Sequence, residues 1–417
     1  MDPVRRKALK KGQDRRGRMK WLTLLLLAIG ACGAPPSSNA DPRAPVSWSA
    51  LSSRLDQTCG LDADGTPFCW GSGWLGSTAP RDVCAATVDP VTGLGGERAC
   101  AKRPVQVGAG PFTRLALGEN GAFGLGLDGV LWVWGLNQNQ SLGFTNSGST
   151  SPDQYLSALR SPIADTLKLS AVAAAADGAC GITTDRRLFC WGMPGPRTGS
   201  LAAPACDDPA LCGVAPQQIG PLIRKWTDVT VGAAHACALD SGGSVGCWGR
   251  GDRGQLGYPP AHTCTQGDAS YPCEIRPGST VLNRFLRVAA AGDLTCGLTG
   301  LDGPLICWGS PALALPGRYT DFAVSPTEVC GLTDGGNVIA CAGTGGMTAG
   351  LVSAGGTSAL GETAVALTMG QGFACARTRD GVAYCAGTQI LGHLGDGRDD
   401  PGVFRSTPVP VSAPYRD

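Results

Sequence analysis

The stretch CGLDADGTPFCWG, residues 59–71, places two cysteines around an Asp-Gly pair and ends in Trp-Gly. Asp-Gly or Gly-Gly between two short apolar runs is typical of the tight turn of a β-hairpin. The two cysteines would then face each other on antiparallel strands, where Cα atoms lie about 4.5–5.5 Å apart and within disulfide range. The pattern returns, before Trp-Gly or Ala-Gly, at Cys180–Cys190, Cys237–Cys247, Cys296–Cys307, Cys330–Cys341 and Cys375–Cys385.

A seventh copy lacks the sulfur atoms. In FGLGLDGVLWVWG, residues 123–135, Phe123 and Val133 stand where the two cysteines belong. A metal or redox site would not survive that replacement, whereas two facing positions in a buried hairpin accept an apolar pair as readily as a disulfide. The copies therefore predict structural hairpins.

Seven hairpins separated by 34 to 64 residues predict an all-β, seven-bladed propeller over residues 48–417. Intra-blade disulfides would staple the blades, and the uneven spacing places insertions in loops. Only 22 positions separate Trp48 from Trp70, too few for a full blade, and some 30 residues follow Gly387. We therefore expect the C-terminal strand to complete the first blade and close the ring.

The segment VGAAHACALDSGGSVGCWGRGDRGQLGY, residues 231–258, resembles the repeat of the regulator-of-chromosome-condensation family. WGLNQNQSLGF (134–144) and LGHLGDG (391–397) are similar to its Trp-Gly and Gly-Gln-Leu-Gly parts. The resemblance implies a seven-bladed propeller. The family includes a guanine-nucleotide exchange factor on chromatin and exported bacterial relatives that inhibit β-lactamases. It thus implies a protein-binding ring, while the exchange activity does not fit an exported, acidic chain.

The N-terminus predicts export. Nine basic residues in the first twenty precede the apolar run WLTLLLLAIGA, residues 21–31, which is too short for a transmembrane helix. Residues 1–31 therefore read as a lipoprotein signal peptide, with Met1 or Met19 as the start. Ile29-Gly30-Ala31-Cys32 resembles the bacterial lipobox, so we expect Cys32 to be lipidated. Residues 32–47 would form a flexible tether.

The location and charge of the mature chain restrict its partners. Gly33, rather than Asp, follows the lipidated cysteine, which in Gram-negative lipoproteins implies the outer membrane. Without residues 1–31 the chain keeps 25 basic and 31 acidic residues, a net charge of −6. Nucleic-acid binding is not expected, since it depends on a basic surface. The membrane is expected as a partner only through the N-terminal lipid.

Every one of the 19 cysteines can be assigned once. Cys32 takes lipid, the hairpins take twelve, and the remaining six form the close pairs Cys84–Cys100, Cys206–Cys212 and Cys264–Cys273. Nine disulfides are consistent with an oxidising compartment. A zinc site in HTCTQGDASYPC, residues 262–273, is the weaker alternative, because no C-x-x-C motif is present. No metal and no cofactor is expected.

Catalysis finds no support, and the chain is expected not to be an enzyme. His235 lies at a strand start and suits packing, and His262 and His393 are isolated in loops. Asp62-Ala63-Asp64-Gly65 lacks the remaining ligands of a calcium loop and reads as a turn. Arg250-Gly251-Asp252 spells an adhesion tripeptide that also suits the turn of the repeat.

Four insertions, residues 77–103, 144–167, 193–222 and 258–283, leave after the Trp-Gly segments and so share one face of the ring. Three contain a predicted disulfide, which lowers the entropy lost on binding. We expect an envelope module that binds an unknown protein or glycan. A polysaccharide-binding or adhesion role is the first alternative and would show as exposed aromatic side chains at Trp74, Tyr155, Tyr258 and Tyr271. An enzyme with a site at the ring centre is the second.

Overall fold

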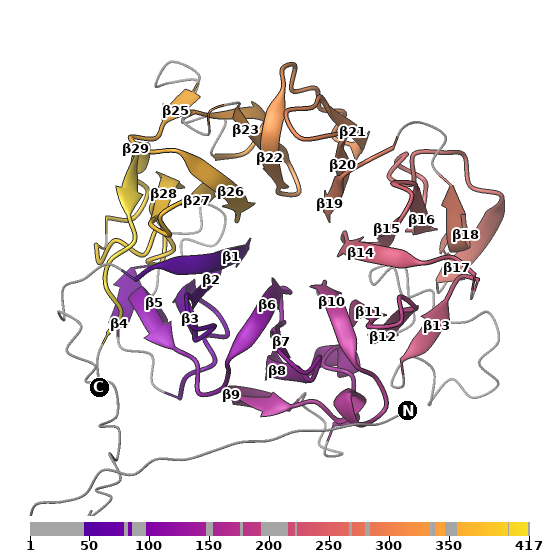
Figure 1. Cartoon of the computed structure of the whole chain (residues 1–417), viewed down its shortest axis with the longest axis horizontal. Coiled ribbons are helices and arrows are strands. Elements are labelled where there is room, and N and C mark those ends of the chain that lie inside the picture. Colours follow the sequence, from indigo (N-terminus) through magenta and orange to yellow (C-terminus); the bar gives the residue numbers. More distant parts are fainter. Residues whose placement is uncertain are drawn as a thin grey trace, which may run out of the picture. The chain divides into compact units, whose positions relative to one another are not determined.

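The computed structural model describes residues 46–78, 82–85, 97–146, 153–175, 178–192, 216–221, 223–266, 269–279, 284–333, 335, 338–346, 357–398 and 400–415. These residues form seven antiparallel sheets arranged around a central axis (Figure 1). The expected seven-bladed, all-β propeller is confirmed. Two turns of 3-10 helix, η1 (Gln138–Gln140) and η2 (Pro162–Asp165), are the helical segments of this part of the chain.

Each blade contributes its first strand to the centre of the ring and its following strands in order toward the rim. Blade 1 consists of β1 (Trp48–Arg54), β2 (Gln57–Asp62), β3 (Pro67–Ser72), β5 (Glu97–Gln106) and the edge strand β4 (Asp82–Ala85). Blade 2 consists of β6 (Phe112–Leu117), β7 (Gly121–Gly126), β8 (Leu131–Leu136) and β9 (Gln154–Arg160). Blade 3 consists of β10 (Leu169–Ala174), β11 (Gly178–Thr183), β12 (Leu188–Gly192) and β13 (Gln217–Ile219).

The second half of the chain repeats this plan. Blade 4 consists of β14 (Trp226–Val231), β15 (His235–Asp240), β16 (Val245–Arg250), β18 (Ala269–Ser279) and the edge strand β17 (His262–Gln266). In the described residues blade 5 has three strands, β19 (Arg287–Ala291), β20 (Asp293–Leu298) and β21 (Leu305–Ser310). Blade 6 consists of β22 (Tyr319–Val324), β23 (Glu328–Thr333), β24 (Val338–Gly343) and β25 (Thr357–Ala359). Blade 7 consists of β26 (Ala364–Met369), β27 (Phe373–Thr378), β28 (Ala383–Thr388) and β29 (Phe404–Pro410).

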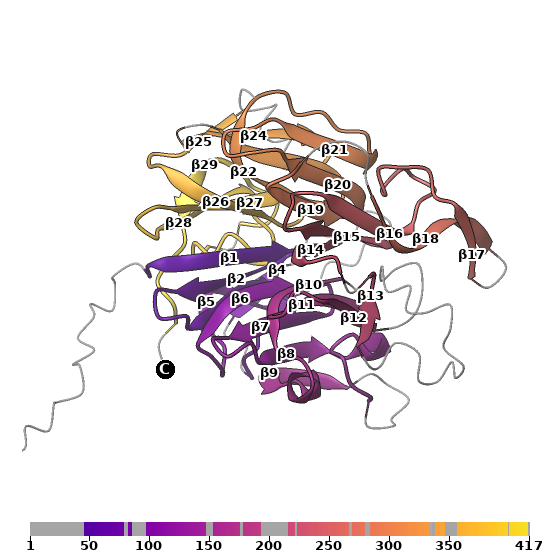
Figure 2. The same ribbon diagram turned by 45° about the vertical axis from the view of Figure 1, so that its right-hand side comes forward.

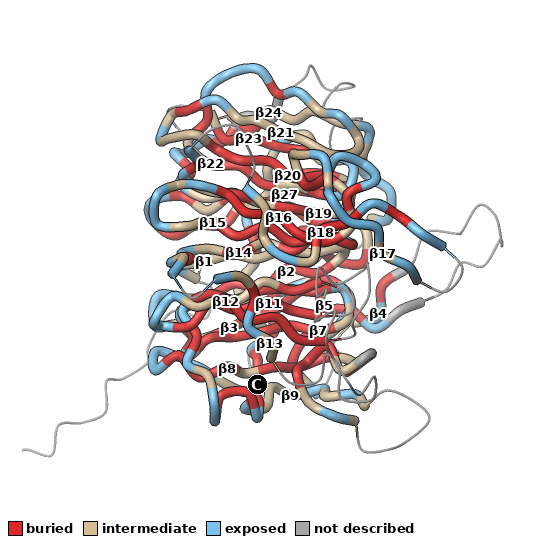
Figure 3. Tube along the Cα trace, turned by 90° about the vertical axis from the view of Figure 1, so that its right-hand side faces the viewer, coloured by how far each residue is buried: buried red, intermediate tan, exposed pale blue. Residues whose placement is uncertain are grey.

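The core lies in the middle strands of the blades, where one blade packs on the next (Figure 3). The repeated hairpins supply these strands, and Cys59 pairs with Cys69 in the register of β2 and β3. Trp70, Trp134, Trp191 and Trp248 are completely buried. Small residues let the sheets approach, and the packed tryptophans fill the space between them. In the described residues no helix is long and apolar enough to span a membrane.

One hydrogen bond recurs where neighbouring blades meet. A residue at the start of an inner strand, or two positions before it, donates its amide proton to a carbonyl in the hairpin turn of the preceding blade. Phe112 donates to Gly65 at 2.8 Å, and Phe285 donates to Gly243 at 2.8 Å. Gly65 and Gly243 have φ values of +81° and +83°, which an L side chain rarely adopts. The Asp-Gly and Gly-Gly turns therefore close the hairpin and also join it to the next blade.

The ring closes through the same bond. Trp48, which opens β1, donates its amide to the carbonyl of Gly381 in blade 7 at 2.6 Å. The expectation that the C-terminal strand completes blade 1 is wrong, since β29 pairs with β28 and completes its own blade 7. Blade 1 is complete because β1 precedes its hairpin and β5 returns after the insertion to pair with β3. The segment after β29 does reach blade 1, where the Tyr415 amide donates to Pro104 at 2.9 Å.

Candidate functional site

The Trp-Gly anchors are packing elements between blades. The indole Nε1 of Trp70 donates to the His393 carbonyl of blade 7 at 3.1 Å, and that of Trp308 donates to the Gln255 carbonyl of blade 4 at 3.0 Å. The glycine beside Trp308 has a φ of +101°, and a Cβ on it would lie 2.1 Å from a backbone oxygen. The tryptophan and the glycine of these anchors therefore pack within the wall of the ring and do not line a ligand-binding pocket.

His235 is structural, as its position at a strand start predicts. Its side chain is completely buried, and Nε2 lies 2.6 Å from Thr295 Oγ1. Thr295 Oγ1 donates its own proton to the Gln255 carbonyl at 3.2 Å, so His235 Nε2 is the donor in this pair. Burial lowers the pKa of His235 to about 3. The imidazole is therefore neutral at physiological pH and unsuited to proton transfer with solvent.

Eight disulfides lie in the described residues. Six join the facing cysteines of the repeated hairpins, with Cα–Cα distances of 4.0 to 4.1 Å; Cys237–Cys247 is one example. Cys84–Cys100 and Cys264–Cys273 join strands of the insertions at 5.9 and 5.8 Å. In the sulfur-free copy, Phe123 pairs with Val133 in the same register. Cys206, Cys212 and the expected lipidation site Cys32 lie outside the described residues.

The four aromatic residues expected on an exposed face are not exposed. Trp74 packs against the core of blades 1 and 2, and its carbonyl accepts from Trp134 Nε1 at 3.0 Å. Tyr155 stacks edge-on against Phe144, and Tyr258 donates its hydroxyl proton to the Cys247 carbonyl at 2.8 Å. Tyr271 is buried, with 7% of its surface exposed. Local packing that composition does not reveal therefore covers part of the Trp74, Tyr155 and Tyr258 side chains and nearly all of Tyr271.

The Arg-Gly-Asp tripeptide is bound within the chain. Arg250 donates from Nε and Nη2 to both carboxylate oxygens of Asp252, at 2.7 and 2.6 Å. The guanidinium also lies over the ring of Tyr271, 5.1 Å from its centroid. This pairing lowers the pKa of Asp252, chiefly through the hydrogen bond from Arg250. A receptor that reads the two charges separately would have to break a bidentate ion pair.

The remaining polar candidates serve local structure. Asp62 Oδ1 accepts from the amides of Asp64 and Thr66 at 2.9 and 2.8 Å, which makes this stretch a hairpin turn. His393 is completely buried and stacks on Phe373 at 4.1 Å. In the considered zinc segment both cysteines are bonded to each other. Across the part of the chain that the structure describes, no group of three or more His, Cys, Asp or Glu side chains is placed to hold a metal ion.

Two insertions form a second hairpin at the outer edge of their blades, and we call these the rim hairpins: β4–β5 in blade 1 and β17–β18 in blade 4. Figure 2 shows β17–β18 projecting from the ring. Its base is held in place by three bonds, because the Ala261 amide and His262 Nδ1 donate to the Glu274 carboxylate at 2.6 and 3.0 Å, and the Gly251 amide donates to Pro272 at 2.9 Å. The blade 4 rim hairpin is therefore an ordered, outward-pointing surface.

The axis of the ring is the place where a central enzyme site would lie. Residues from all seven inner strands line a cavity there, including Ser52, Leu117, Thr230 and Met369. In the described lining there is no Asp, Glu, His, Cys, Lys or Tyr. The described wall thus offers serine and threonine hydroxyls, such as Ser52 and Thr230, but no side chain that could act as a general base to activate them.

Sequence reasoning missed a repeated hydroxyl residue. In five blades the second residue of the inner strand is Ser or Thr, and it sits at a β-bulge. Ser49, Thr113 and Thr227 each donate a hydroxyl proton to a carbonyl of the next strand. The signal was present as an apolar residue followed by Ser or Thr at Trp48-Ser49, Phe112-Thr113, Leu169-Ser170, Trp226-Thr227 and Tyr319-Thr320.

The fold defines a class, the seven-bladed β-propeller, and one part of the chain matches a known repeat. Residues 226–255 and 242–298 match two models of the regulator of chromosome condensation (RCC1) repeat. The first match lies in blade 4 and the second extends from blade 4 into blade 5. Together they cover residues 231–258, which carry the resemblance in the sequence, and so confirm it.

Among solved structures, human WBSCR16 superimposes with a TM-score of 0.64 at 19% identity, covering 83% of this chain and 94% of that one. Prp20p from Saccharomyces cerevisiae superimposes at 0.61 with 17% identity, covering 88% and 87%. Human E3 ubiquitin-protein ligase HERC2 is 26% identical over 210 residues, 49% of this chain and 4% of that protein. Ultraviolet-B receptor UVR8 of Arabidopsis thaliana is 25% identical over 198 residues, 47% of this chain and 40% of that protein. The chain thus spans less than half the length of these curated relatives.

Proposed function

We propose that this chain is an exported, lipid-anchored propeller that acts as a protein-binding module at the cell envelope. The observation that carries the proposal is the set of eight disulfides, two of which hold the rim hairpins. Disulfides persist in oxidising compartments, which agrees with the signal sequence and with lipidation at Cys32. A hairpin ordered before contact loses less entropy when a partner binds.

Relatives favour a protein as the partner. The structure of Prp20p was described together with its binding to Gsp1p and histones, and the same yeast protein was solved bound to Kap60. The four buried or half-buried aromatic rings give no comparable support for a glycan. We therefore place the binding surface on the rim hairpins of blades 1 and 4.

Affinity capture from the native envelope tests this proposal. The tagged mature chain is expected to enrich one or a few envelope proteins. A variant that replaces residues 262–273 with Gly-Gly should lose them, because it removes the blade 4 rim hairpin together with both of its cysteines. His262 and Cys273 face each other in the strand pair, so the flanking residues 261 and 274 are close enough to be joined by a short turn. Arg318→Gln is the control, since it changes an exposed residue in the connection between blades 5 and 6, outside the rim hairpins.

The proposal fails if no envelope protein is enriched over the untagged strain. It also fails if capture is unchanged after both rim hairpins are shortened. A polysaccharide retained in place of a protein would favour the adhesion alternative.

Lipid anchoring has its own test. Cys32→Ser is expected to move the protein from the membrane fraction to the soluble fraction and to abolish labelling with radioactive palmitate. A protein that keeps its label and its membrane location after this substitution contradicts the anchor.

A further inference from the structure

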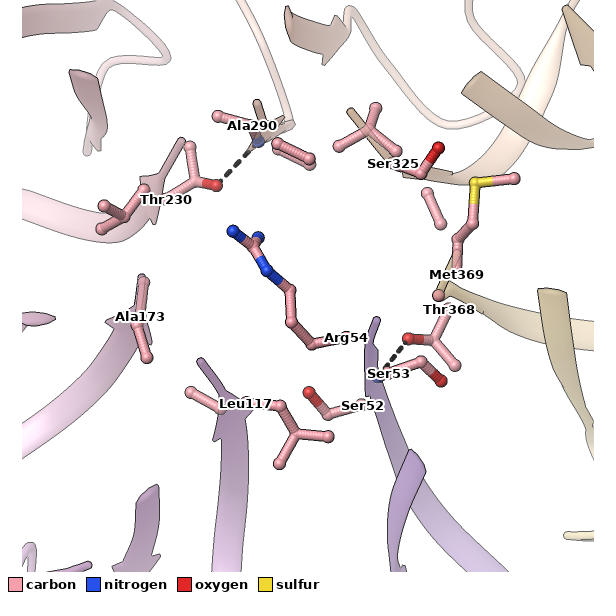
Figure 4. A pocket seen from close by; sticks show the side chains of 18 of the residues that line it. Ser52, Ser53, Arg54, Leu117, Ala173, Thr230, Ala290, Ser325, Thr368 and Met369 are labelled. Atoms are coloured by element: carbon pink, nitrogen blue, oxygen red, sulfur yellow. Dashed lines mark hydrogen bonds between the residues drawn. The ribbon is translucent and has the colours of Figure 1, made fainter. Parts of the chain in front are cut away.

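The cavity on the ring axis is lined by two arginines whose carboxylate partners, Glu119 for Arg54 and Asp321 for Arg287, lie outside its lining. The cavity has a volume of about 220 Å³, and its described lining includes Arg54 and Arg287 but no Asp or Glu. Figure 4 shows Arg54 among the lining residues. Most of the wall is small and apolar, with hydroxyl groups at Ser52, Thr230 and Thr368. An enclosed cation in such surroundings is attracted to anions more strongly than one in bulk water.

Arg54 is exceptional within the repeat. It stands two residues beyond Ser52, the inner-strand residue that pairs with the first hairpin cysteine, Cys59. The same position in the other six blades, judged from strand register, holds Gly118, Ala175, Gly232, Ala291, Ser325 and Gly370. Six blades therefore fold with a small residue here, and the propeller does not require an arginine at this position.

Arg54 has donors to spare. A guanidinium carries five N–H donors. Among the described residues its acceptor is Glu119 Oε1, which lies 3.3 Å from Arg54 Nη2. Figure 4 shows the rest of the side chain extending into the cavity. Arg287, by contrast, is held at the wall, because its Nη1 donates both to the Asp321 carboxylate and to the Phe322 carbonyl.

Backbone amides add further donors around the axis. The Ser53 amide donates to Thr368 Oγ1 and the Ala290 amide to Thr230 Oγ1, each at 2.8 Å across a junction between blades. At four other junctions between blades, alanine stands where Thr230 and Thr368 stand in theirs. In order, Ala116 stands at the junction with the amide of Ala174, Ala173 with that of Val231, Ala289 with that of Val324, and Ala323 with that of Met369. A methyl group cannot accept a hydrogen bond, so these four amides lie in the cavity wall without a hydroxyl partner.

We propose that the axial cavity binds a small oxyanion, a carboxylate or a phosphate, between the Arg54 guanidinium and the uncapped amides of the inner strands. Charge-assisted bonds from arginine to these groups are the strong ones in proteins. The volume is below the roughly 300–1,000 Å³ of pockets for drug-sized ligands, which favours a free ion or one acidic side chain. This site is separate from the rim hairpins, so its failure would leave the proposed function untouched.

Calorimetric titration of the exported chain with citrate, inorganic phosphate and N-acetylglutamate tests the site. At least one probe is expected to bind saturably with a Kd at or below about 1 mM. Arg54→Gln should weaken binding about tenfold or more, since it removes the charge. Ala173→Thr copies the native Thr230 and should weaken binding roughly threefold by capping the Val231 amide without changing the charge. Arg318→Gln removes an exposed arginine in the connection between blades 5 and 6; it is the control and should bind like the wild type.

The outcomes separate the sources of the anion. Binding of phosphate or citrate alone points to a free ion, and binding of N-acetylglutamate points to the side chain of a partner; either result supports the site. Absence of saturable binding by all three probes overturns it. Equal affinity in Arg54→Gln and wild type overturns it as well, and Ala173→Thr decides the matter if the arginine variant does not fold.

Discussion

His235 shows that one position of the repeat carries different chemistry in different blades. It pairs in register with the glycine of its Trp-Gly anchor. The equivalent residues of the other blades are Gln57, Gly121, Gly178, Leu294, Glu328 and Phe373. In blade 1 the Gln57 amide nitrogen donates to the Trp74 carbonyl at 2.5 Å, much as His235 donates to Thr295. A buried polar residue here serves to satisfy a neighbouring acceptor.

The depressed pKa of His235 predicts an acid-sensitive fold. Burial holds its pKa at about 3 in the folded state, against 6.5 for the ordinary side chain. Between these two pH values the His235 side chain is protonated in the unfolded chain but not in the folded chain. The free energy of unfolding therefore decreases as the pH drops from about 6.5 toward 3. His235→Gln should remove on the order of 2 kcal/mol of the stability loss between pH 6.5 and pH 4.5. Denaturant unfolding at the two pH values measures this, and an identical loss in both proteins contradicts it.

The anchor glycines should tolerate no side chain. Gly249 has a φ of +109°, and a Cβ there would lie 2.6 Å from the His235 Cα. Gly254 also has a positive φ, +75°, but a Cβ there meets nothing within 4 Å. Gly254→Ala should therefore cost about 1–2 kcal/mol from conformation alone, and Gly249→Ala clearly more. Thermal unfolding of the two variants compares them, and equal losses would show that the close approach is unimportant.

The hairpins were predictable because each is encoded locally, in a turn and two facing residues about ten positions apart. For the same reason the sequence correctly predicted that Phe123 and Val133 face each other. The prediction that the C-terminal strand, β29, completes blade 1 failed because the sequence does not show which segment packs at the axis where the ring closes. The short stretch before Cys59 already contains the complete inner strand β1. Burial of Tyr271 under Arg250 and the direction of Arg54 depend on neighbours remote in sequence. The local sequence around Tyr271 and Arg54 therefore does not predict the burial of the one or the direction of the other.

Loss of a hairpin disulfide should depend on what replaces it. Cys237→Ala with Cys247→Ala removes a cross-link that closes a loop of about ten residues, which should cost about 3 kcal/mol. Cys237→Val with Cys247→Val imitates the apolar pair of blade 2 and should recover roughly 1 kcal/mol or more through buried methyl groups. Chemical denaturation under oxidising conditions tests the order of stabilities. A valine variant no more stable than the alanine variant would contradict the role given to Phe123 and Val133.

On the scale of the whole ring, the seam between blades 7 and 1 is reinforced by the chain's last residues. The Ser412 amide donates to Gly395 at 2.8 Å, and Tyr415 bonds to Pro104 through its amide and to Asp82 through its hydroxyl. Ending the chain after Pro410 should loosen this seam and leave the other junctions intact.

Hydrogen exchange read by mass spectrometry measures that loosening. Amides of β1 and β26 are expected to exchange about tenfold faster or more, while those of β14 and β19 remain unchanged. Tyr415→Phe, which removes only the hydroxyl bond, should have a smaller effect. Equal acceleration in all seven blades, or none, contradicts a local seam.

Seven hairpins around one axis, six of them held by a disulfide, are the basis of the fold and of the proposal that the protein is exported. Non-reducing peptide mapping by mass spectrometry of the protein from its own envelope tests this most directly. We predict that Cys59 is linked to Cys69 and that each other hairpin cysteine is linked to the partner facing it within the same blade. Free thiols at these positions, or links between cysteines of different blades, would contradict the account.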